Sequence, residues 1–278
     1  MTLFDSGVRP AIDEWLLAEA AKERDYGEYW SASSAGYCMR RNIFTRLGVP
    51  KVEKDDAARL QRVFTAGHLF HDWIQGITKK AGLSIASEVE LQDEDLMIRG
   101  HFDDLVLMRF DENGETPVRM GSEQRASSLI LYDYKTQNSR AFDYNRPMSY
   151  YHKLQLGTYM YMLRKLPDAD TLTPGLTAKA DLEMVKDLTE ARILKIEKDT
   201  LRMQEEQLLW SEELESAVKN YWNTLNNYWN RQALPACSCH KHEGGFLAKE
   251  KWNGYFYEGQ PCSIKWYEKF KATKGEKI

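Results

Sequence analysis

The stretch SLILYDYKT, residues 128–136, decides the fold of this chain. Its apolar and aromatic run predicts a buried strand. Since side chains alternate along a strand, Asp133 and Lys135 point to one face and Tyr134 to the other. A carboxylate beside an ammonium at a strand end is a candidate metal ligand beside a candidate activator of water. The alternative is an ion pair on the surface, which would contribute little to stability.

The segments around this strand predict an α/β fold. Expected helices cover residues 10–21, 34–47, 55–81, 149–166 and 200–232, and expected strands cover residues 84–91, 96–110, 128–136 and 191–197. The first three strands form an antiparallel meander, with a polar segment containing the hairpin signal Asn113-Gly114 between the second and third. This order predicts a mixed sheet flanked by helices.

Two further segments carry groups suited to metal binding. The stretch GHLFH, residues 67–71, lies on an expected helix, and GHFDD, residues 100–104, lies on the strand before SLILYDYKT. Asp103 can therefore supply a second carboxylate beside Asp133, and His71 an imidazole. Carboxylate oxygens suit Mg²⁺ or Mn²⁺, and the added imidazole favours Mn²⁺.

Several neighbouring residues compete for these roles. His68 is expected to be a helix-surface or packing residue. Asp104 is expected to face away from Asp103 and to be a supporting or solvent-exposed residue. Glu88 and Glu90 share one strand face and could approach a metal, but a solvated strand edge is the preferred interpretation.

Four motifs occur in a fixed order along the chain: G-x-x-x-H at 67–71, G-x-x-D at 100–103, D-x-K-T at 133–136, and Gln155-x-x-x-Tyr159. Each motif alone is common. Their order, and their placement on helix, strand, strand and helix, resembles the RecB-like branch of the PD-(D/E)XK nuclease superfamily. The resemblance covers residues 63–159, and the order of elements extends it to the strand near Ile193.

The resemblance implies a PD-(D/E)XK core, with a site at which His71, Asp103, Asp133 and the backbone carbonyl of Tyr134 hold Mg²⁺ or Mn²⁺. Lys135 would orient or deprotonate the attacking water. Gln155 and Tyr159, four apart on one helical face, would pack over the site and position Lys135 and the DNA strand. The implied activity is metal-dependent hydrolysis of DNA, as an exonuclease at ends or on single strands in recombination, repair or phage DNA processing.

The four cysteines are Cys38, Cys237, Cys239 and Cys262. One cysteine before the core and three after it resembles the iron–sulfur branch of these nucleases, the CRISPR-adaptation and AddB-type exonucleases, which implies a [4Fe-4S] cluster. The spacing departs from that branch, because a single residue separates Cys237 from Cys239. A zinc site built from the last three cysteines and a histidine is the alternative, and thiols without metal are the third possibility.

The composition limits the class of partner. The chain has 278 residues, a formal net charge of -4 and 42% hydrophobic residues, which excludes a binder held to nucleic acid by bulk charge. Local contacts to the DNA backbone are expected from Arg40, Arg41, Arg146 and Lys153. No apolar run approaches the ~20 residues of a membrane span, and no secretory signal is visible. We expect a cytoplasmic protein, in a bacterium or a phage-infected cell, with no membrane partner.

The expected organisation is a single nuclease domain over residues 1–278. A helical segment covers 1–62, the PD-(D/E)XK core 63–198, and a helix with a cysteine-bearing tail 199–278. Two rival functions stay open: a catalytically silent DNA-binding or adaptor module of the same fold, and a structure-specific endonuclease. No P-loop motif is present, so a helicase or recombination partner would be a separate chain.

Overall fold

A six-stranded mixed sheet organises the protein. The computed structural model describes residues 8–21, 28–47, 57–110, 126–144, 146–166 and 185–235. Its strands are β1 (Trp30–Ser31), β2 (Ser84–Asp93), β3 (Ile98–Phe110), β4 (Ala126–Gln137), β5 (Glu190–Glu197) and β6 (Met203–Leu209). Its helices are α1 (Val8–Ala21), α2 (Met39–Arg46), α3 (Ala57–Lys80), α4 (Ser139–Asp143), α5 (Tyr150–Arg164) and α7 (Glu212–Asn230), with a 3-10 turn η1 at Ala32–Ser34.

The strand pairing confirms the expected mixed sheet. The order is β1-β3-β4-β5-β6, with β2 also paired to β3. The antiparallel pairs are β2–β3, β3–β4 and β5–β6, whereas β1–β3 and β4–β5 are parallel. The meander of three strands predicted from the sequence is therefore present, and β4, which carries residues 128–136, lies at the centre of the order.

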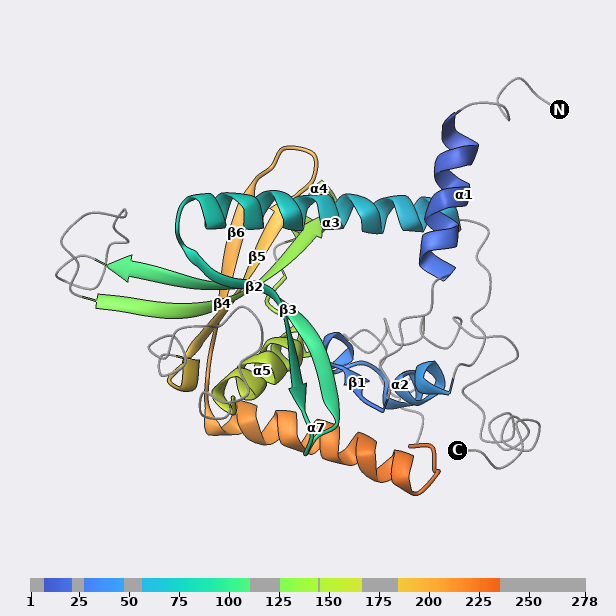
Figure 1. The fold of residues 1–278 in the computed structure, drawn as a ribbon, viewed down its shortest axis with the longest axis vertical. Helices are drawn as coiled ribbons and strands as arrows, with labels where there is room; N and C mark the ends of the chain where they lie inside the picture. Colours follow the sequence, from blue (N-terminus) through green and yellow to red (C-terminus); the bar gives the residue numbers. More distant parts are fainter. Residues whose placement is uncertain are drawn as a thin grey trace.

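Helices cover both faces of the sheet. Figure 1 shows α3 running across one face and α5 with α7 on the other. Each face has its own apolar cluster. The cluster under α3 is small and includes Ile74, Ile130 and Tyr134. The cluster under α5 and α7 is the larger one, and it includes Leu131, Leu156 and Trp222. The two faces of β4 therefore meet different surroundings.

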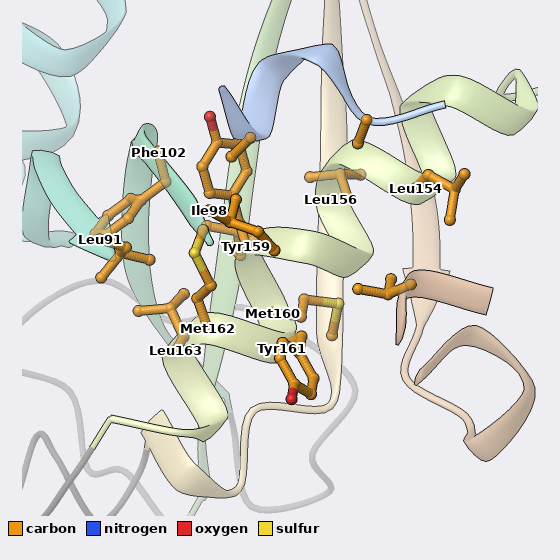
Figure 2. Close-up of a cluster of buried hydrophobic side chains, with 14 of the residues drawn as sticks. Leu91, Ile98, Phe102, Leu154, Leu156, Tyr159, Met160, Tyr161, Met162 and Leu163 are labelled. Atoms are coloured by element: carbon orange, nitrogen blue, oxygen red, sulfur yellow. The ribbon is translucent and has the colours of Figure 1, made fainter. Parts of the chain in front are cut away.

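The helix α5 is buried almost along its whole length. Ser149 caps it, since its hydroxyl accepts a hydrogen bond from the His152 backbone N–H. Every residue from 154 to 163 is buried, and Figure 2 shows their side chains against the sheet. At Gly157 an added Cβ would lie 2.8 Å from a Leu214 side-chain carbon, so the glycine lets α7 approach closely. A helix that is buried on all sides in this way belongs to the protein core rather than to the surface.

One sequence prediction is wrong: residues 200–232 are not a single helix. Residues 203–209 form the edge strand β6, in which partly buried and exposed side chains alternate. That alternation has the period of a strand. The helix α7 begins only after Ser211, whose hydroxyl accepts the Leu214 N–H, with Glu212 and Glu213 in the first turn. This capping serine followed by acidic residues is the signal that marked the true start.

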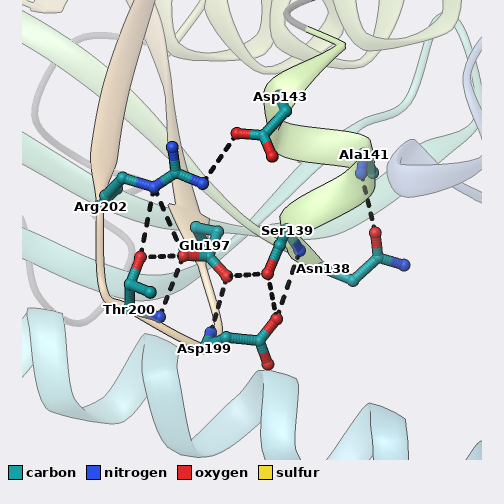
Figure 3. A network of polar contacts seen from close by, with 8 residues as sticks. All are labelled: Asn138, Ser139, Ala141, Asp143, Glu197, Asp199, Thr200 and Arg202. Atoms are coloured by element: carbon teal, nitrogen blue, oxygen red, sulfur yellow. Dashed lines mark hydrogen bonds and ion pairs between the residues drawn. The ribbon is translucent and has the colours of Figure 1, made fainter.

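A polar network joins the turn after β5 to the segment after β4. The Glu197 carboxylate is fully buried and accepts hydrogen bonds from the Ser139 hydroxyl at 2.7 Å and from the backbone N–H groups of Asp199 and Thr200 (Figure 3). Hydrogen bonds, led by those from the Thr200 and Ser139 hydroxyls, hold the pKa of Glu197 at about 2. The network therefore ties α4 to the β5–β6 turn.

Some predictions fall outside the described residues. These are the Asn113-Gly114 turn and the three cysteines after residue 235. The single-domain organisation stays a prediction. Among the described helices, none combines the length and the apolar character needed to span a membrane.

Candidate metal centre

The site begins where β3 and β4 separate. Their ladder runs as far as the pair Asp104 and Tyr132. At the next position the Asp103 side chain accepts a hydrogen bond from the Tyr134 backbone N–H, with 2.7 Å between Tyr134 N and Asp103 Oδ2. A side-chain carboxylate thus takes the place of a ladder partner, which fixes that carboxylate between the two strands.

His71 reaches this carboxylate from α3. One turn earlier, Gly67 lies close to the end of β4, since an added Cβ there would be in van der Waals contact with Thr136 Oγ1 at 3.5 Å. His71 Nδ1 lies 3.5 Å from Asp103 Oδ2. His71, Glu88 and Asp103 each offer a ligand atom within 4.8 Å of the others. Within the described part of the chain this is the one such group of histidine and acidic side chains.

Glu88 lies close to the other candidate ligands, although a solvated strand edge was the preferred interpretation from the sequence. It is exposed, as expected for a strand edge, yet its carboxylate belongs to the three-residue group. Its φ of 54° lies in the left-handed region, an uncommon conformation for glutamate. Gln75, one turn after His71 on α3, also joins the site, and no sequence motif marks it. It is buried and donates to Glu88 Oε1 at 2.8 Å and to the Asp103 carbonyl at 2.9 Å.

The Asp133 and Lys135 pair lies beside this group, on the α5 side of β4. Lys135 Nζ lies 2.9 Å and 2.8 Å from the two carboxylate oxygens of Asp133. Gln155 on α5 donates to Asp133 Oδ1 at 3.3 Å. Asp133 Oδ2 is buried. Although it lies close to the Lys135 ammonium, it makes no hydrogen bond of good geometry with a described residue. It therefore has a lone pair left for a cation.

Burial and neighbouring charges shift the pKa values of three residues at the site. Burial, and then the neighbouring charge of Asp133, raise the pKa of Asp103 to about 8. Burial and the positive charge of Lys135 lower the pKa of His71, which favours the neutral imidazole that binds metals. For Lys135, burial lowers the pKa, but the charges of Asp133 and Asp103 outweigh it and the pKa is raised.

Asp104 points to the opposite face, as predicted, but it is fully buried rather than exposed to solvent. It accepts hydrogen bonds from the hydroxyls of Thr78 at 2.7 Å, Ser84 at 2.5 Å and Tyr134 at 2.8 Å. The Tyr134 ring also meets the His71 ring edge to face, with centroids 5.9 Å apart. Asp104 therefore anchors the residue whose N–H holds Asp103.

Two of the predicted residues are buried. Tyr159 is 3% exposed within the larger core, with its hydroxyl oxygen close to Gly100, and its role at the metal centre stays a prediction. Arg40 is 4% exposed, and its Nε donates to the Pro235 carbonyl at 2.6 Å. The Arg40 guanidinium is thus engaged in the interior, and its contact with DNA stays a prediction.

The other predicted basic contacts lie nearer the surface. Arg146 and Lys153 are exposed, and Arg41 is partly exposed. Cys38 is the residue before α2 and is partly exposed. His68 is exposed on α3, as expected, and does not enter the three-residue group. The DNA contacts of these basic residues, and the Tyr134 carbonyl as a ligand, stay predictions.

The donor set fits a divalent cation. One imidazole and two carboxylates converge, and Asp133 Oδ2 has no hydrogen-bond partner among the described residues. Burial, and then the charge of Asp133, raise the pKa of Asp103 to about 8. Each of these features is relieved when a cation replaces the proton. Mixed oxygen and nitrogen ligands suit Mg²⁺ or Mn²⁺.

The mixed sheet, the flanking helices and the acidic site at the separation of β3 and β4 define the PD-(D/E)XK nuclease fold. A sequence model of the PD-(D/E)XK nuclease superfamily matches residues 118–241. This match supports a nuclease superfamily domain and includes Asp133, Lys135 and Gln155. His71, Glu88 and Asp103 precede the matched region and join the site only through the fold.

Solved structures with 14% sequence identity resemble this chain. The crystal structure of SSO0001 has a TM-score of 0.46, with 84% of this chain and 93% of that chain covered. The LHK-Exo complex with dAMP and the alkaline exonuclease LHK-Exo from Laribacter hongkongensis have TM-scores of 0.38 and 0.34, each over 79% of this chain and 97% of that chain. No curated protein matches this chain.

Proposed function

We propose that this protein is a divalent-metal-dependent DNA nuclease that acts as an exonuclease at DNA ends or on single strands. The observation that carries the proposal is the convergence of His71, Glu88 and Asp103 within 4.8 Å, beside the Asp133 and Lys135 pair. The superfamily match over residues 118–241 supports the nuclease class.

The metal ligands in this proposal are His71, Glu88, Asp103 and Asp133, with the Tyr134 carbonyl as a further oxygen. A bound divalent ion supplies Lewis-acid polarisation of the scissile phosphate and a lowered pKa for coordinated water. The Tyr134 N–H keeps Asp103 oriented between the strands, and Gln155 keeps Asp133 oriented from α5. These contacts hold the carboxylates in place before any substrate arrives.

Lys135 orients the attacking water in this proposal. Its raised pKa keeps the ammonium charged at neutral pH, so it donates hydrogen bonds and stabilises negative charge that develops on the phosphate. Its side chain is 28% exposed while that of Asp133 is 6% exposed, so the ammonium is the more accessible member of the pair. Hydrolysis would leave a 5′-phosphate and a 3′-hydroxyl.

The test is digestion of end-labelled linear DNA and of circular single-stranded DNA with Mg²⁺ or Mn²⁺. We expect chelator-sensitive loss of the linear substrates and intact circles. Cleavage of circles would favour the endonuclease alternative. An absence of cleavage with either metal, together with DNA binding, would favour the catalytically silent module.

We further propose that the four cysteines hold a [4Fe-4S] cluster, as in the iron–sulfur members of the RecB-like branch. A hydrogen bond between residues far apart in the sequence supports this proposal: Arg40 Nε donates to the Pro235 carbonyl. Cys38 precedes Arg40 by two residues, and Cys237 follows Pro235 by two. The contact places the residue that follows Cys38 by two beside the residue that precedes Cys237 by two, as a shared metal site would require. The cluster would staple α2 to the carboxyl-terminal tail.

Protein purified without oxygen should contain iron and be brown. Cys38→Ser should remove colour and iron, whereas Asp133→Asn, which changes only the catalytic site, should keep both. One zinc ion per chain without iron would favour the zinc alternative. Protein without bound metal would show that the cysteines are thiols that bind no metal. Assignment to recombination, repair or phage DNA processing, with a separate helicase as partner, stays part of the proposal.

A further inference from the structure

Aromatic rings and a guanidinium gather at the amino-terminal end of α5. The ring centroids of Tyr37 and Tyr151 are 5.8 Å apart, with their planes tilted by 35°. Arg41 Cζ lies 4.4 Å from the Tyr37 ring centroid, and the His152 ring lies 3.9 Å from the Tyr151 ring. These are the separations of stacked aromatic groups and of cation–π contacts.

Core packing does not account for this group. Tyr37, Arg41 and Tyr151 are partly exposed, and the two tyrosines belong to neither apolar cluster. Tyr159 and Tyr161, further along the same helix, are both buried in the larger cluster. The described part of α5 therefore separates its tyrosines into core residues and residues at the surface beside the metal centre.

The fold fixes Tyr37 against α5. Gly36 has a φ of +76°, and a Cβ there would lie 2.7 Å from Tyr151 Cα, so only glycine allows this approach. The Tyr37 carbonyl accepts a hydrogen bond from the Tyr221 hydroxyl of α7 at 2.9 Å. These contacts hold the Tyr37 main chain beside α5, and its ring packs against Tyr151 and Arg41.

The group adjoins the metal centre. Tyr151 precedes Gln155 by four residues, so the two side chains lie on one helical face, and Gln155 donates to Asp133. The Tyr37 ring packs against the Tyr151 ring at the same end of α5. Both rings therefore lie one helical turn before the residue that contacts Asp133.

We infer that Tyr37, Arg41 and Tyr151 form a stacking platform for an unpaired nucleotide of the DNA strand that enters the metal centre. This inference rests on the proposed nuclease function and adds the substrate class, a strand whose bases are unpaired beside the cleaved bond. Aromatic faces stack any base, and a guanidinium adds cation–π attraction and a contact to phosphate. A paired base cannot use this platform, because its neighbours in the duplex cover both of its faces.

The test uses the full chain carrying Lys135→Ala, with Ca²⁺ in place of Mg²⁺, so that the probe stays intact. The probe is a single-stranded oligonucleotide containing 2-aminopurine, whose fluorescence falls when the base stacks. We expect Tyr151→Leu or Tyr37→Leu to weaken single-strand binding roughly fivefold to 150-fold and to restore the fluorescence. Binding of the matching duplex should change by less than about twofold.

Matched variants separate stacking from folding. Tyr151→Phe and Tyr37→Phe keep the ring and should bind like the parent protein. Tyr29→Leu removes a partly exposed tyrosine that bonds Glu94 at the far end of β2, and should change nothing. Arg41→Lys keeps the charge but not the planar group, and should weaken single-strand binding about threefold, which tests the platform without altering either ring.

Unchanged binding in the leucine variants, or equal losses for single strand and duplex, would overturn the platform. The nuclease proposal is tested separately by digestion with the unmodified protein. If that protein cleaves DNA and the leucine variants still quench 2-aminopurine, the platform alone fails. If it cleaves nothing with Mg²⁺ or Mn²⁺ but the variants behave as expected, the platform stands as a single-strand binding site and the nuclease proposal fails.

Discussion

Asp103 and Asp104 are neighbours on β3 with opposite surroundings. Asp103 lies among His71, Asp133 and Lys135, and its pKa is raised to about 8 by burial and by the Asp133 charge. Asp104 is fully buried on the other face, where three hydroxyl groups donate hydrogen bonds to it. One carboxylate lies among other ionisable groups, and the other among neutral donors.

Because side chains alternate along a strand, one face of β3 presents a candidate metal ligand and the other presents a carboxylate that stabilises the fold. A carboxylate surrounded by hydroxyl donors has its charge satisfied within the protein and gains nothing from a cation. A carboxylate crowded by another carboxylate retains a proton until a cation replaces it. Burial alone therefore does not identify a functional acid, because the nature of the partners decides. The following predictions test this comparison, starting from the largest expected effect.

Lys135→Ala should lower DNA cleavage by about 1000-fold, because it removes the cation that orients water beside the metal ligands. The melting temperature of this variant in the presence of Mn²⁺ should stay near that of the parent protein, because the metal replaces the positive charge beside Asp133. Lys219→Ala is the matched control, because that lysine is 46% exposed on α7 and forms a surface ion pair with Glu215. Cleavage by the variant above a few per cent of the parent would remove Lys135 from the mechanism.

Asp103→Asn should lower Mn²⁺ affinity by about 100-fold, as measured by calorimetry without DNA. Asparagine still accepts the Tyr134 N–H, so the strands keep their positions while one negative ligand is lost. Glu88→Gln should weaken binding in the same direction if Glu88 is a ligand. Unchanged affinity in Asp103→Asn would place the metal elsewhere.

Mn²⁺ affinity should rise with pH and level off near pH 8, by up to about tenfold per pH unit below that point. The reason is that Asp103 binds a proton more tightly in the folded protein than in the unfolded chain, where its pKa is near 4. The metal-free protein should therefore lose stability as pH rises from about 4 to 8, and Asp103→Asn should remove both dependences. A flat profile in the parent protein would contradict the raised pKa.

Asp104→Ala should lower the free energy of unfolding by about 3 kcal/mol, because three hydroxyl groups, including that of the buried Tyr134, lose their acceptor. Cleavage per folded molecule should fall by less than about tenfold, since Asp104 is linked to Asp103 through Tyr134 rather than directly. Asp143→Ala, which removes an exposed carboxylate paired with Arg202, is the control and should change stability by less than about 0.5 kcal/mol. If Asp104→Ala lost as much Mn²⁺ affinity as Asp103→Asn, the assignment of metal binding to Asp103 and of structural support to Asp104 would be wrong.

The sequence alone determined four strands of the sheet and the faces on which the polar residues of β4 lie. Apolar runs and alternation located β2, β3, β4 and β5, and the period of two placed Asp133 and Lys135 on one face and Tyr134 on the other. The spacing of the motifs selected His71 and Asp103, which the fold brings within 3.5 Å of each other. These features are local, so a periodic pattern or a short motif records them.

Tertiary structure decided the rest. Glu88 and Gln75 join the site through the pairing of β2 with β3 and the position of α3, and no short motif contains them. Arg40 and Tyr159 are buried because distant segments pack over them, which their own sequence neighbourhoods do not record. Residues 203–209 became an edge strand because β5 offered a pairing partner, which outweighed a weak helical pattern. Contacts between segments far apart in the chain depend on how helices and strands pack, and a local pattern carries no information about that packing.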